Sequence, residues 1–384
     1  MSLDDDALAE LAALDAAHRL RSPRVIEGRQ GPTVMVEGRE VICLASNDYL
    51  SLAGDPRLAA AAAVALEVEG TGAGGSRLIT GTQRSHVELE VRVADWMQVD
   101  GVRLFNTGYA ANVGVMTTIA GAGDRVFSDE LNHASIIDGC RLSRAALEVF
   151  PHRDLGVLER ALQSGGWRRK IVVTESLFSM DGDVADLVAL AAVCRRHDAA
   201  LIVDEAHAIG AQGPEGRGVC AAVGVVPDVL IGTFGKALGT FGAFAATTKA
   251  IAELLWNRAR PFVFSTALPP SIPAATIAAI EIVRGVEGEE RRRTLARHAR
   301  LIRELIPAAG GVADSAIAPL QVGDDREVMR MSARMLVEGL LVQGIRPPTV
   351  PSGTARLRLS LGAGHTTRQL EAAAHVINNA MRHE

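Results

Sequence analysis

Lysine is rare in this chain of 384 residues, where arginine supplies all but three of the forty basic side chains. Lys236 lies in the segment TFGKALG, directly after an apolar run at 229–231. Lysine is almost never fully buried without a partner, and arginine cannot replace it in forming a Schiff base. Lys236 is therefore a candidate for a covalent link to a cofactor, although a lysine reaching from an apolar turn into solvent would give the same pattern. Lys170 and Lys249 are both expected to face solvent.

A carboxylate follows the apolar run at 201–203, in the segment LIVDEAH. Asp204 and His207 could form an acid–base pair or a metal site, or Asp204 could simply cap the turn that follows. Pyridoxal phosphate offers the pair a more specific use. A buried carboxylate keeps the pyridine nitrogen of that cofactor protonated, so that its ring can accept electrons. His207 would then bond the ring hydroxyl.

Two further polar segments follow apolar runs. NTGYAAN at 106–112 opens a helix, and its free backbone N–H groups could hold a phosphate, although an ordinary strand-to-helix turn would look the same. DELNHAS at 129–135 contains His133, and a lone histidine in such a place is more often structural. The order of the segments is the one that a single pyridoxal site would require, continuing through Ser179, Asp204, His207, Thr233 and Lys236.

The glycine-rich stretch GTGAGGSR at 70–77 resembles a dinucleotide-binding loop but lacks its context. A helical, alanine-rich segment precedes it where an apolar strand is required, and no acidic residue follows at the necessary distance. The stretch is better explained as a flexible loop that lets another backbone or a substrate approach closely.

The elements that carry these residues alternate between short apolar runs and Ala/Leu-rich helical stretches. The apolar runs lie at 103–105, 125–127, 146–150, 171–174, 201–203 and 229–231. Such alternation predicts an α/β fold with crossover units and a mostly parallel sheet that is buried on both faces. Ligands of such sheets bind beyond the carboxyl ends of the strands, where the polar segments lie.

We predict a division of the chain into three parts. Residues 1–45 would form an N-terminal arm, with a helix over 5–20, a linker over 21–29 and a hairpin over 32–44. Residues 46–270 would form a large cofactor-binding domain. Residues 271–384 would form a smaller α+β domain.

The pattern changes near the start of this smaller domain. A long helical segment is predicted from Pro273 to about Ile306, and later a strand over 355–361 and a final helix. The uncharged run at 261–280 is long enough to span a bilayer, but it contains four prolines, which a spanning helix would not carry together. We interpret this run as a domain junction.

Composition and charge exclude several classes of protein. The chain is 48% hydrophobic, which excludes a disordered chain, and its net charge of −5 without a basic stripe argues against a nucleic-acid partner. Four scattered cysteines without metal-ligand spacing argue against a zinc site and indicate a reducing compartment. The acidic N-terminus lacks a signal-peptide pattern. We expect a cytoplasmic protein without a membrane partner.

Taken together, the motifs resemble those of the α-oxoamine synthases, which are fold type I pyridoxal-phosphate enzymes. The matching segments are SNDYLSLA (46–53), GTGAGGSRLITGTQRSHVELE (70–90), NTGYAANVGV (106–115), DELNHASIIDG (129–139), FSMDGD (178–183), VDEAHAIGAQGPEGRG (203–218), TFGKALG (233–239) and PPTVPSGTARLRLSL (347–361). The resemblance covers nearly the whole chain. It implies a mostly parallel central sheet and a smaller α+β C-terminal domain.

The resemblance also implies roles for the residues around the cofactor ring. Lys236 would hold pyridoxal 5'-phosphate as a Schiff base and later remove the α-proton of the amino acid. Asp204 would pair with the pyridinium nitrogen, and His133 would stack on the ring. His207 and Ser179 would lie near the ring hydroxyl.

Further matches concern the phosphate of the cofactor. Gly108, Tyr109 and Thr233 would lie on the phosphate side. Ser265 and Thr266 belong to a segment that, in the family, reaches the phosphate in the partner subunit. The resemblance therefore implies a homodimer with shared active sites.

The remaining matches concern the substrates. Asn47 and Arg358 would hold the carboxylate of the amino acid, while Arg21 and Thr349 would contact the acyl substrate. The family carries out a decarboxylative condensation of an amino acid with an acyl thioester. The segments GGSRLITG and GTARLRLSL favour the member that joins L-alanine to a pimeloyl thioester, carried by CoA or by acyl carrier protein, on the route to biotin.

Two alternatives stay open. The chain could be another α-oxoamine synthase that uses glycine or serine or a different acyl-CoA, as glycine C-acetyltransferases and aminolevulinate synthases do, because a fold does not fix a substrate. It could also be a non-catalytic pyridoxal-binding regulator. Such regulators usually carry an added DNA-binding module, for which this chain has neither a spare domain nor a basic stripe.

Overall fold

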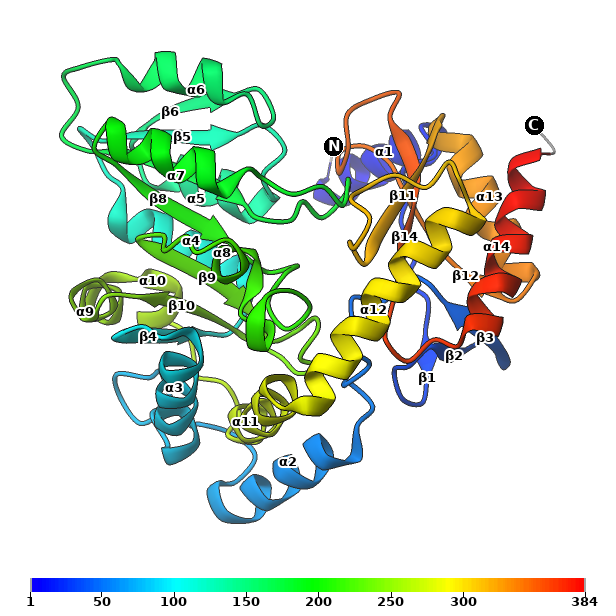
Figure 1. Ribbon diagram of the computed structural model, residues 1–384, viewed down its shortest axis with the longest axis horizontal. Helices are drawn as coiled ribbons and strands as arrows, with labels where there is room; N and C mark the ends of the chain where they lie inside the picture. Colours follow the sequence, from blue (N-terminus) through cyan, green and yellow to red (C-terminus); the bar gives the residue numbers. More distant parts are fainter. Residues whose placement is uncertain (1, 383–384) are drawn as a thin grey trace. The chain divides into compact units, whose positions relative to one another are not determined.

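The computed structural model describes residues 2–382, which fall into two units (Figure 1). Unit 1 comprises Met1–Asn47, Met180–Gly182 and Thr294–Glu384, and unit 2 comprises Asp48–Ser179 and Asp183–Arg293. Unit 2 contains the large sheet and the lysine-bearing turn that the sequence singles out.

A seven-stranded sheet forms the centre of unit 2. Its strands, in spatial order, are β4 (Gly101–Phe105), β10 (Ala243–Thr247), β9 (Val229–Thr233), β8 (Ala199–Asp204), β7 (Lys170–Glu175), β5 (Arg125–Asp129) and β6 (Ala146–Phe150). All neighbouring strands from β9 to β6 are parallel, whereas β10 runs antiparallel to both β4 and β9. The predicted mostly parallel sheet is confirmed. Sequence analysis missed β10, because its residues AFAAT are mostly alanine, which has low strand propensity.

The helices of unit 2 begin at residues that satisfy their free N–H groups. The side chains of Thr107, Asp186 and Thr248 each accept a hydrogen bond from the backbone N–H three residues further on. The helices are α2 (Pro56–Glu69), α3 (Arg84–Met97), α4 (Gly108–Ile119), α5 (Ala134–Leu142), α6 (Leu155–Leu162), α7 (Leu187–Arg196), α8 (Gly218–Ala222), α9 (Lys249–Arg258), α10 (Arg260–Val263) and α11 (Ser271–Arg284), with one 3-10 turn at Pro214–Gly216.

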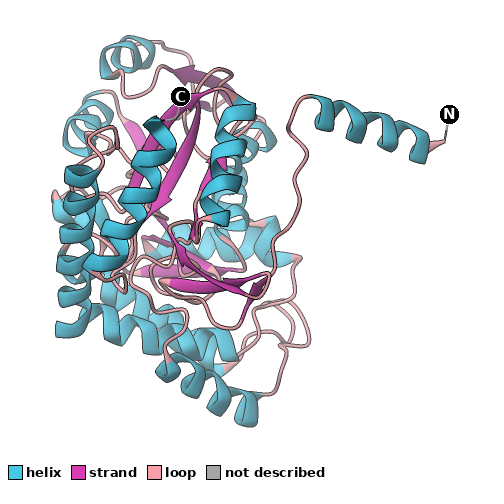
Figure 2. Cartoon of the chain, turned by 90° about the vertical axis from the view of Figure 1, so that its right-hand side faces the viewer, coloured by secondary structure: helices cyan, strands magenta, loops and turns pink. Residues whose placement is uncertain are grey.

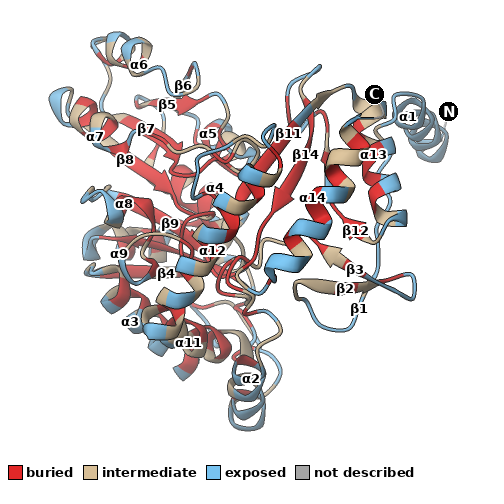
Figure 3. Cartoon of the chain, turned by 45° about the vertical axis from the view of Figure 1, so that its right-hand side comes forward, coloured by how far each residue is buried: buried red, intermediate tan, exposed pale blue. Residues whose placement is uncertain are grey.

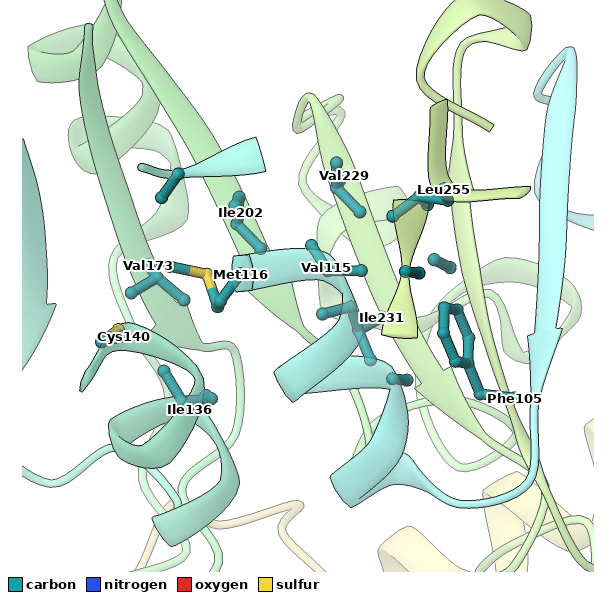
Figure 4. Packing of buried hydrophobic residues seen from close by; sticks show 14 of the residues in the cluster. Phe105, Val115, Met116, Ile136, Cys140, Val173, Ile202, Val229, Ile231 and Leu255 are labelled. Atoms are coloured by element: carbon teal, nitrogen blue, oxygen red, sulfur yellow. The ribbon is translucent and has the colours of Figure 1, made fainter. Parts of the chain in front are cut away.

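A buried apolar cluster fixes α4 and α5 against the sheet. Met116 of α4 and Ile136 of α5 pack with Ile202 of β8 and Ile231 of β9 (Figure 4). Burial of each such side chain contributes about 1.5–3 kcal/mol relative to exposure. The strands are buried along most of their length (Figure 3). This packing holds the N-terminal ends of α4 and α5 at the same edge of the sheet as the carboxyl ends of β7 and β8.

Unit 1 contains two small sheets. The first has the order β1 (Ile26–Glu27), β2 (Thr33–Val36), β3 (Arg39–Cys43) and β12 (Leu340–Leu341), and the second has the order β11 (Ile317–Gly323), β14 (Ala355–Ser360) and β13 (Gln343–Ile345). The predicted hairpin is the antiparallel pair β2–β3. The predicted linker is partly wrong, because β1 pairs with β2. Parallel pairing of β12 with β3 joins the two ends of the chain in one sheet.

The helices of unit 1 differ in how they are packed. The unit contains α13 (Asp325–Val337), α14 (Thr367–Arg382) and the part of α12 (Val286–Leu305) that follows Arg293. The first helix, α1 (Leu3–Ala16), buries no residue and stands off on an extended segment (Figure 2).

The single long helical segment predicted from Pro273 is wrong. It is divided into α11 and α12 because Gly285 has an extended backbone, with φ −78° and ψ 179°. The uncharged run at 261–280 forms most of α10 and the first part of α11. Among residues 2–382, no helix has the length and the apolar character needed to cross a membrane.

Candidate active site

Lys236 lies in the turn after β9, and its amine contacts a histidine. Lys236 Nζ lies 2.8 Å from His207 Nε2, and His207 Nδ1 lies 2.7 Å from the hydroxyl of Tyr49, which is fully buried. Two predicted residues are thus brought together, and Tyr49 joins them. Sequence analysis quoted the segment around Tyr49 but gave it no role. The scarcity of tyrosine was an available signal, since the only two in the sequence, Tyr49 and Tyr109, both lie in matched motifs.

Asp204 ends β8 and accepts two hydrogen bonds. One oxygen accepts from the backbone N–H of Ala206 at 2.8 Å, and the other accepts from Asn112 Nδ2 of α4 at 2.7 Å. Asp204 therefore does cap the turn that follows β8, but this cap uses only one of its two carboxylate oxygens. Asn112 was missed as a partner, although it ends the motif NTGYAAN. Two N–H donors hold Asp204 in one orientation, as a partner for a pyridinium nitrogen must be held.

His133 begins α5 and is exposed at the surface of unit 2. Its Nδ1 accepts a hydrogen bond from the backbone N–H of Ser135, so it caps the helix. Although the residue as a whole is exposed, neighbouring groups desolvate its ring and so lower the pKa of His133. The charge of Lys236 acts in the same direction, and the charge of Asp204 opposes both. Nδ1 therefore has the structural role expected of a lone histidine, because it caps the helix. The rest of the exposed ring is accessible to a ligand.

Lys170 begins β7 and was expected to face solvent, which is wrong. Its amine donates hydrogen bonds to the backbone oxygens of Leu162 and His197, so the side chain joins α6 to the end of α7. Lys249 begins α9 and is exposed, as predicted.

Glu175 is a buried carboxyl group that sequence analysis did not consider. The register of the parallel strands β7 and β8 sets Glu175 beside Asp204. Burial, and then the charge of Asp204, raise the pKa of Glu175 to about 8. Glu175 accepts a hydrogen bond from the backbone N–H of His133 at 2.7 Å. It therefore holds the His133 turn, and its raised pKa favours the protonated form of Glu175 beside Asp204.

The N-terminus of α4 lies beside Thr233 at the end of β9. A Cβ atom placed on Gly108 would lie 3.9 Å from Cβ of Thr233. Thr233 Oγ1 donates to the carbonyl of Gly242 and accepts from the N–H of Gly235. The Tyr109 hydroxyl donates to Asp138 of α5. A helix N-terminus beside a hydroxyl suits a phosphate group.

Thr266 contacts Asn106, the first residue of the segment NTGYAAN, within the same chain. Its carbonyl accepts from Asn106 Nδ2 at 2.8 Å, and it forms a β-bridge with Ser76 of the glycine-rich stretch. The neighbouring Ala267 donates its N–H to the carbonyl of Gly75. Another backbone thus approaches the stretch closely, as predicted. The roles of Ser265 and Thr266 toward a partner subunit stay predictions.

Ser179 lies in a tight turn of unit 2. The turn is closed by a bridge between Leu177 and Val184 and by a hydrogen bond from the N–H of Phe178 to the carbonyl of Asp183. The role of Ser179 near the ring hydroxyl stays a prediction.

Unit 1 carries the residues matched to the carboxylate of the amino acid. Arg358 lies on β14, the middle strand of its sheet, and donates to Asn47 Oδ1 at 3.1 Å and to Ser360 Oγ at 2.9 Å. Its side chain is only 6% exposed. Asn47 and Arg358 are thus brought together.

Arg356 shares the face of Arg358, as the alternation of a strand requires. Arg356 is buried, forms an ion pair with Asp181 and donates to the carbonyl of Thr354. Its charge is therefore already neutralised by the carboxylate of Asp181.

Arg21 and Thr349, matched to the acyl substrate, line one cavity of unit 1. Its volume is about 650 Å³, and Arg24 and Glu37 also line it. The same cavity contains a residue that sequence analysis missed, Arg346, which stands directly before the matched segment PPTVP.

Arg346 is a nearly buried cation whose hydrogen-bond partners are neutral. It is 7% exposed, donates to the carbonyl of Leu20 at 2.8 Å and contacts Met329 Sδ at 2.5 Å. No ion pair joins it to a carboxylate among residues 2–382. Burial, and then the charge of Arg21, lower the pKa of Arg346, while the charge of Asp325 opposes them. Two mutually repelling guanidinium groups on one cavity would both gain from an anion.

The residues of unit 2 fit pyridoxal phosphate. An amine on a strand-end turn, a carboxylate fixed by two N–H donors, an exposed imidazole and a helix N-terminus beside a hydroxyl are the four kinds of group that this cofactor needs. Within the described part of the chain, no cluster of three or more histidine, cysteine or acidic side chains is arranged to hold a metal ion. The four cysteines are buried and unbridged.

Comparisons with known proteins agree with this chemistry. Residues 39–377 match the model of the aminotransferase class I and II family. The chain is 47% identical over 374 residues to 8-amino-7-oxononanoate synthase of Citrifermentans bemidjiense, with 96% of each chain covered. It is 48% identical over 370 residues to the enzyme of the same name from Geobacter sulfurreducens, with 95% of each covered.

Solved structures show the same fold. A serine palmitoyltransferase from S. paucimobilis with bound PLP matches with a TM-score of 0.92 and 34% identity, covering 99% of this chain and 97% of that one. The 8-amino-7-oxononanoate synthase of Francisella tularensis matches with a TM-score of 0.77 and 28% identity, covering 89% of this chain and 98% of that one. The fold is that of the fold type I pyridoxal-phosphate enzymes. The chain belongs to the aminotransferase class I and II family and, within it, to the α-oxoamine synthases.

Proposed function

We propose that this chain is an 8-amino-7-oxononanoate synthase. It would condense L-alanine with a pimeloyl thioester and release carbon dioxide, the free thiol and 8-amino-7-oxononanoate. The observation that carries the chemistry is the contact of Lys236 with His207 beside an Asp204 that Asn112 holds in place. Identity of 45–48% over nearly the whole chain to enzymes of this name supports the choice of substrates.

Pyridoxal 5'-phosphate, when bound, supplies an electron sink for the carbanion at Cα of alanine. Lys236 would hold it through its amine, Asp204 would pair with its ring nitrogen, and His133 would lie on its ring. Gly108, Tyr109 and Thr233 would bind its phosphate.

The remaining work falls to side chains of this protein. Lys236 Nζ would move the α-proton of alanine. His207 would orient that amine through the hydrogen bond of 2.8 Å between its Nε2 and Nζ. Ser179 would assist His207 at the ring hydroxyl.

In unit 1, Arg358 and Asn47 would orient the alanine carboxylate through the guanidinium and amide groups. The charge of Arg358 would bind that carboxylate until it leaves as carbon dioxide. Arg21 and Thr349 would position the acyl thioester in the cavity that they line. CoA and acyl carrier protein are both possible carriers in this proposal.

The proposal includes a homodimer with shared sites, in which Ser265 and Thr266 reach the phosphate bound by the partner subunit. It also includes a cytoplasmic location, in keeping with four unbridged cysteines. Sedimentation of the holoenzyme tests the dimer, and a monomer that turns over alanine at full rate would contradict it.

A second candidate is a synthase that joins serine to a long acyl chain. The structural match to serine palmitoyltransferase, with a TM-score of 0.92, favours it. The small polar difference between alanine and serine is one that a pocket discriminates weakly, by about 100-fold, unless it bonds the hydroxyl.

Thiol release by the holoenzyme separates the candidates. We would compare alanine, glycine and serine as amino donors, each with pimeloyl-CoA, a pimeloyl carrier protein and palmitoyl-CoA. The highest kcat/KM is expected for alanine with a pimeloyl thioester. A preference for serine with palmitoyl-CoA would support the second candidate, and no thiol release with any pair would support a regulator.

A further inference from the structure

A chain of hydrogen bonds in unit 2 connects the carboxylate of Asp204 to the imidazole of His133. Asn112 Nδ2 lies 2.7 Å from Asp204 Oδ2 and 2.9 Å from Ser135 Oγ, and Ser135 Oγ lies 2.7 Å from His133 Nδ1. Asp204, Asn112 and Ser135 are all buried. No motif or comparison assigns a role to Asn112 or Ser135. The chain links two residues that the proposed function treats as independent.

The direction of the first bond follows from the carboxylate. An ionised carboxylate only accepts hydrogen bonds, so the amide of Asn112 must turn its nitrogen toward Asp204. Asn112 Oδ1 is buried without a hydrogen-bond partner among the described residues. Turning the amide over would place that oxygen against the carboxylate, which would repel it. The carboxylate therefore fixes the amide even though one of its atoms remains unsatisfied.

The direction of the second and third bonds follows from the first. The Asn112 amide has two N–H groups, one for Asp204 and one for Ser135 Oγ, which must therefore accept. The proton of the Ser135 hydroxyl is then free to point to His133 Nδ1. The backbone N–H of Ser135 also points to Nδ1, at 3.2 Å, as part of the helix cap. Both donors require an unprotonated Nδ1.

We propose that Asn112 and Ser135 are positioning residues through which the carboxylate of Asp204 fixes the imidazole of His133 as the Nε2–H tautomer. A neutral imidazole with an acceptor at Nδ1 carries its proton on Nε2. This consequence rests on the proposed function: His133 then presents its Nε2–H to the cofactor as a hydrogen-bond donor and does not act as a base. Proton removal is left to Lys236.

The charged groups around His133 are consistent with a neutral ring. Lys236 disfavours a second proton on it, while Asp204 favours one. Glu175 accepts a hydrogen bond from the backbone N–H of His133. Asp204 thus acts on the ring in two ways: its charge favours a second proton, and the donors that it orients, Asn112 and Ser135, favour an unprotonated Nδ1.

Nitrogen NMR of the imidazoles tests the proposal directly. Holoenzyme labelled with ¹⁵N-histidine would be recorded between pH 6 and 8, before and after removal of the cofactor. The His133→Asn variant would assign the signal among the ten histidines. We expect Nε2 to be protonated and Nδ1 to be unprotonated in both forms. A protonated Nδ1 in the wild-type protein would overturn the proposal.

Two variants test the connection to Asp204. Asn112→Leu removes both donors, and Ser135→Ala removes only the hydroxyl, so the second variant keeps the test usable if the first fails to fold. Each should lower the ratio of the Nε2–H to the Nδ1–H tautomer at least about fivefold. Thr117→Val is the matched control on α4, because the Thr117 hydroxyl donates only to carbonyls of its own helix. An unchanged ratio in Ser135→Ala would contradict the connection.

The measurement does not depend on the substrates. If the tautomer responds as expected but no thiol is released from any acyl donor, the proposed function fails and the hydrogen-bond chain stands. If alanine is condensed normally but His133 is protonated at Nδ1, the opposite holds.

Discussion

The network around Asp204 in unit 2 and the cavity lined by Arg346 in unit 1 handle charge in opposite ways. Around Asp204, each oxygen accepts an N–H donor from a different element. In the cavity, Arg346 and Arg21 repel each other, and the recorded partners of Arg346 are a carbonyl and a thioether sulfur. One region therefore has its protons and charges fixed before any ligand arrives. The other keeps positive charge available.

The difference follows from what each region must do. Proton transfer requires that every group be in a defined protonation state and orientation, which neighbouring hydrogen bonds provide in advance. Selection of an anionic substrate requires charge that the protein itself has not neutralised, because binding then relieves repulsion. Substitutions in unit 2 should therefore have the largest effects on turnover, and substitutions in unit 1 should have the largest effects on substrate affinity.

The largest expected effect is that of Lys236→Ala. Loss of the amine that holds the cofactor and moves the α-proton should reduce thiol release by about 10⁴-fold or more. Borohydride reduction of the wild-type holoenzyme followed by peptide mapping should label Lys236. Lys249→Ala is the matched control, since Lys249 is exposed at the start of α9. Label on Lys249 or Lys170 would contradict the assignment.

The next effect is that of Arg358→Lys on alanine. Loss of a planar, two-pronged contact to the carboxylate should cost about 2–5 kcal/mol, or roughly 30-fold or more in alanine affinity. The absorbance of the bound cofactor should remain unchanged, because Arg358 lies in unit 1 and not among the cofactor residues of unit 2. Steady-state kinetics with varied alanine measures the effect.

Arg356→Lys is the control for Arg358→Lys. It disturbs the half-buried ion pair with Asp181, so thermal stability should fall while KM for alanine changes little. If Arg356→Lys lost alanine affinity and Arg358→Lys did not, the carboxylate site would be one strand position away from the proposed one.

A smaller effect is expected for Arg346→Met. KM for the pimeloyl thioester should rise about 10- to 100-fold, since hydrogen bonds to charged groups contribute about 1.5–3 kcal/mol. The melting temperature should stay the same or rise, because a buried cation with neutral partners is replaced by an apolar chain. An increase in KM accompanied by a loss of stability would mean that Arg346 is structural.

The anion that binds in this cavity could be the distal carboxylate of the pimeloyl group or a phosphate of CoA, and a comparison of two acyl donors distinguishes them. An octanoyl thioester lacks the distal carboxylate of the pimeloyl group but keeps the phosphates of CoA. If Arg346 binds the carboxylate, Arg346→Met should leave KM for octanoyl-CoA unchanged. If it binds a phosphate, KM for both thioesters should rise.

The smallest effect on turnover is expected for His152, which lies outside both regions. Burial by itself would lower the pKa of His152, but hydrogen bonds and charge from Asp129 and Asp183 outweigh it and raise the pKa to about 9. The ordinary value in an unfolded chain is about 6.5. The protonated ring should therefore stabilise the fold by roughly 3 kcal/mol below pH 6.5, and this stabilisation should disappear as pH rises through 9.

Urea unfolding of His152→Gln at pH 6 and at pH 9.5 measures this dependence. The difference in unfolding free energy from the wild-type protein should be present at pH 6 and nearly absent at pH 9.5. His375→Gln serves as the control, because His375 is exposed on α14. A difference that is equal at both pH values would show that His152 stabilises by packing alone.

Strand-end residues could be predicted because their signal is local. The apolar runs before Asp204 and Lys236 show that both leave the same edge of a parallel sheet, whatever else the chain does. The hairpin over 32–44 is equally local, and it is confirmed. In contrast, β10 has an alanine-rich sequence with no strand signal, and its pairing between β4 and β9 depends on neighbours far along the chain.

Partners from distant segments could not be predicted. Asn112 lies 92 positions before Asp204, and Tyr49 lies 158 positions before His207, so no spacing rule connects them. Nor could the counter-charge of Arg356 be predicted, because Asp181 comes from a segment 175 positions away. An alternating strand tells which side chains share a face but not what that face meets.

The sequence by itself determined the fold class, the family and the order of the residues that would hold the cofactor, because short apolar runs followed by polar turns fix strand ends. Tertiary structure alone decided which of these groups are already neutralised and which keep a charge. That outcome depends on burial and on hydrogen-bond partners that only the folded chain brings within 3 Å of one another. Arg346, Asn112 and Ser135 owe their proposed roles to such neighbours.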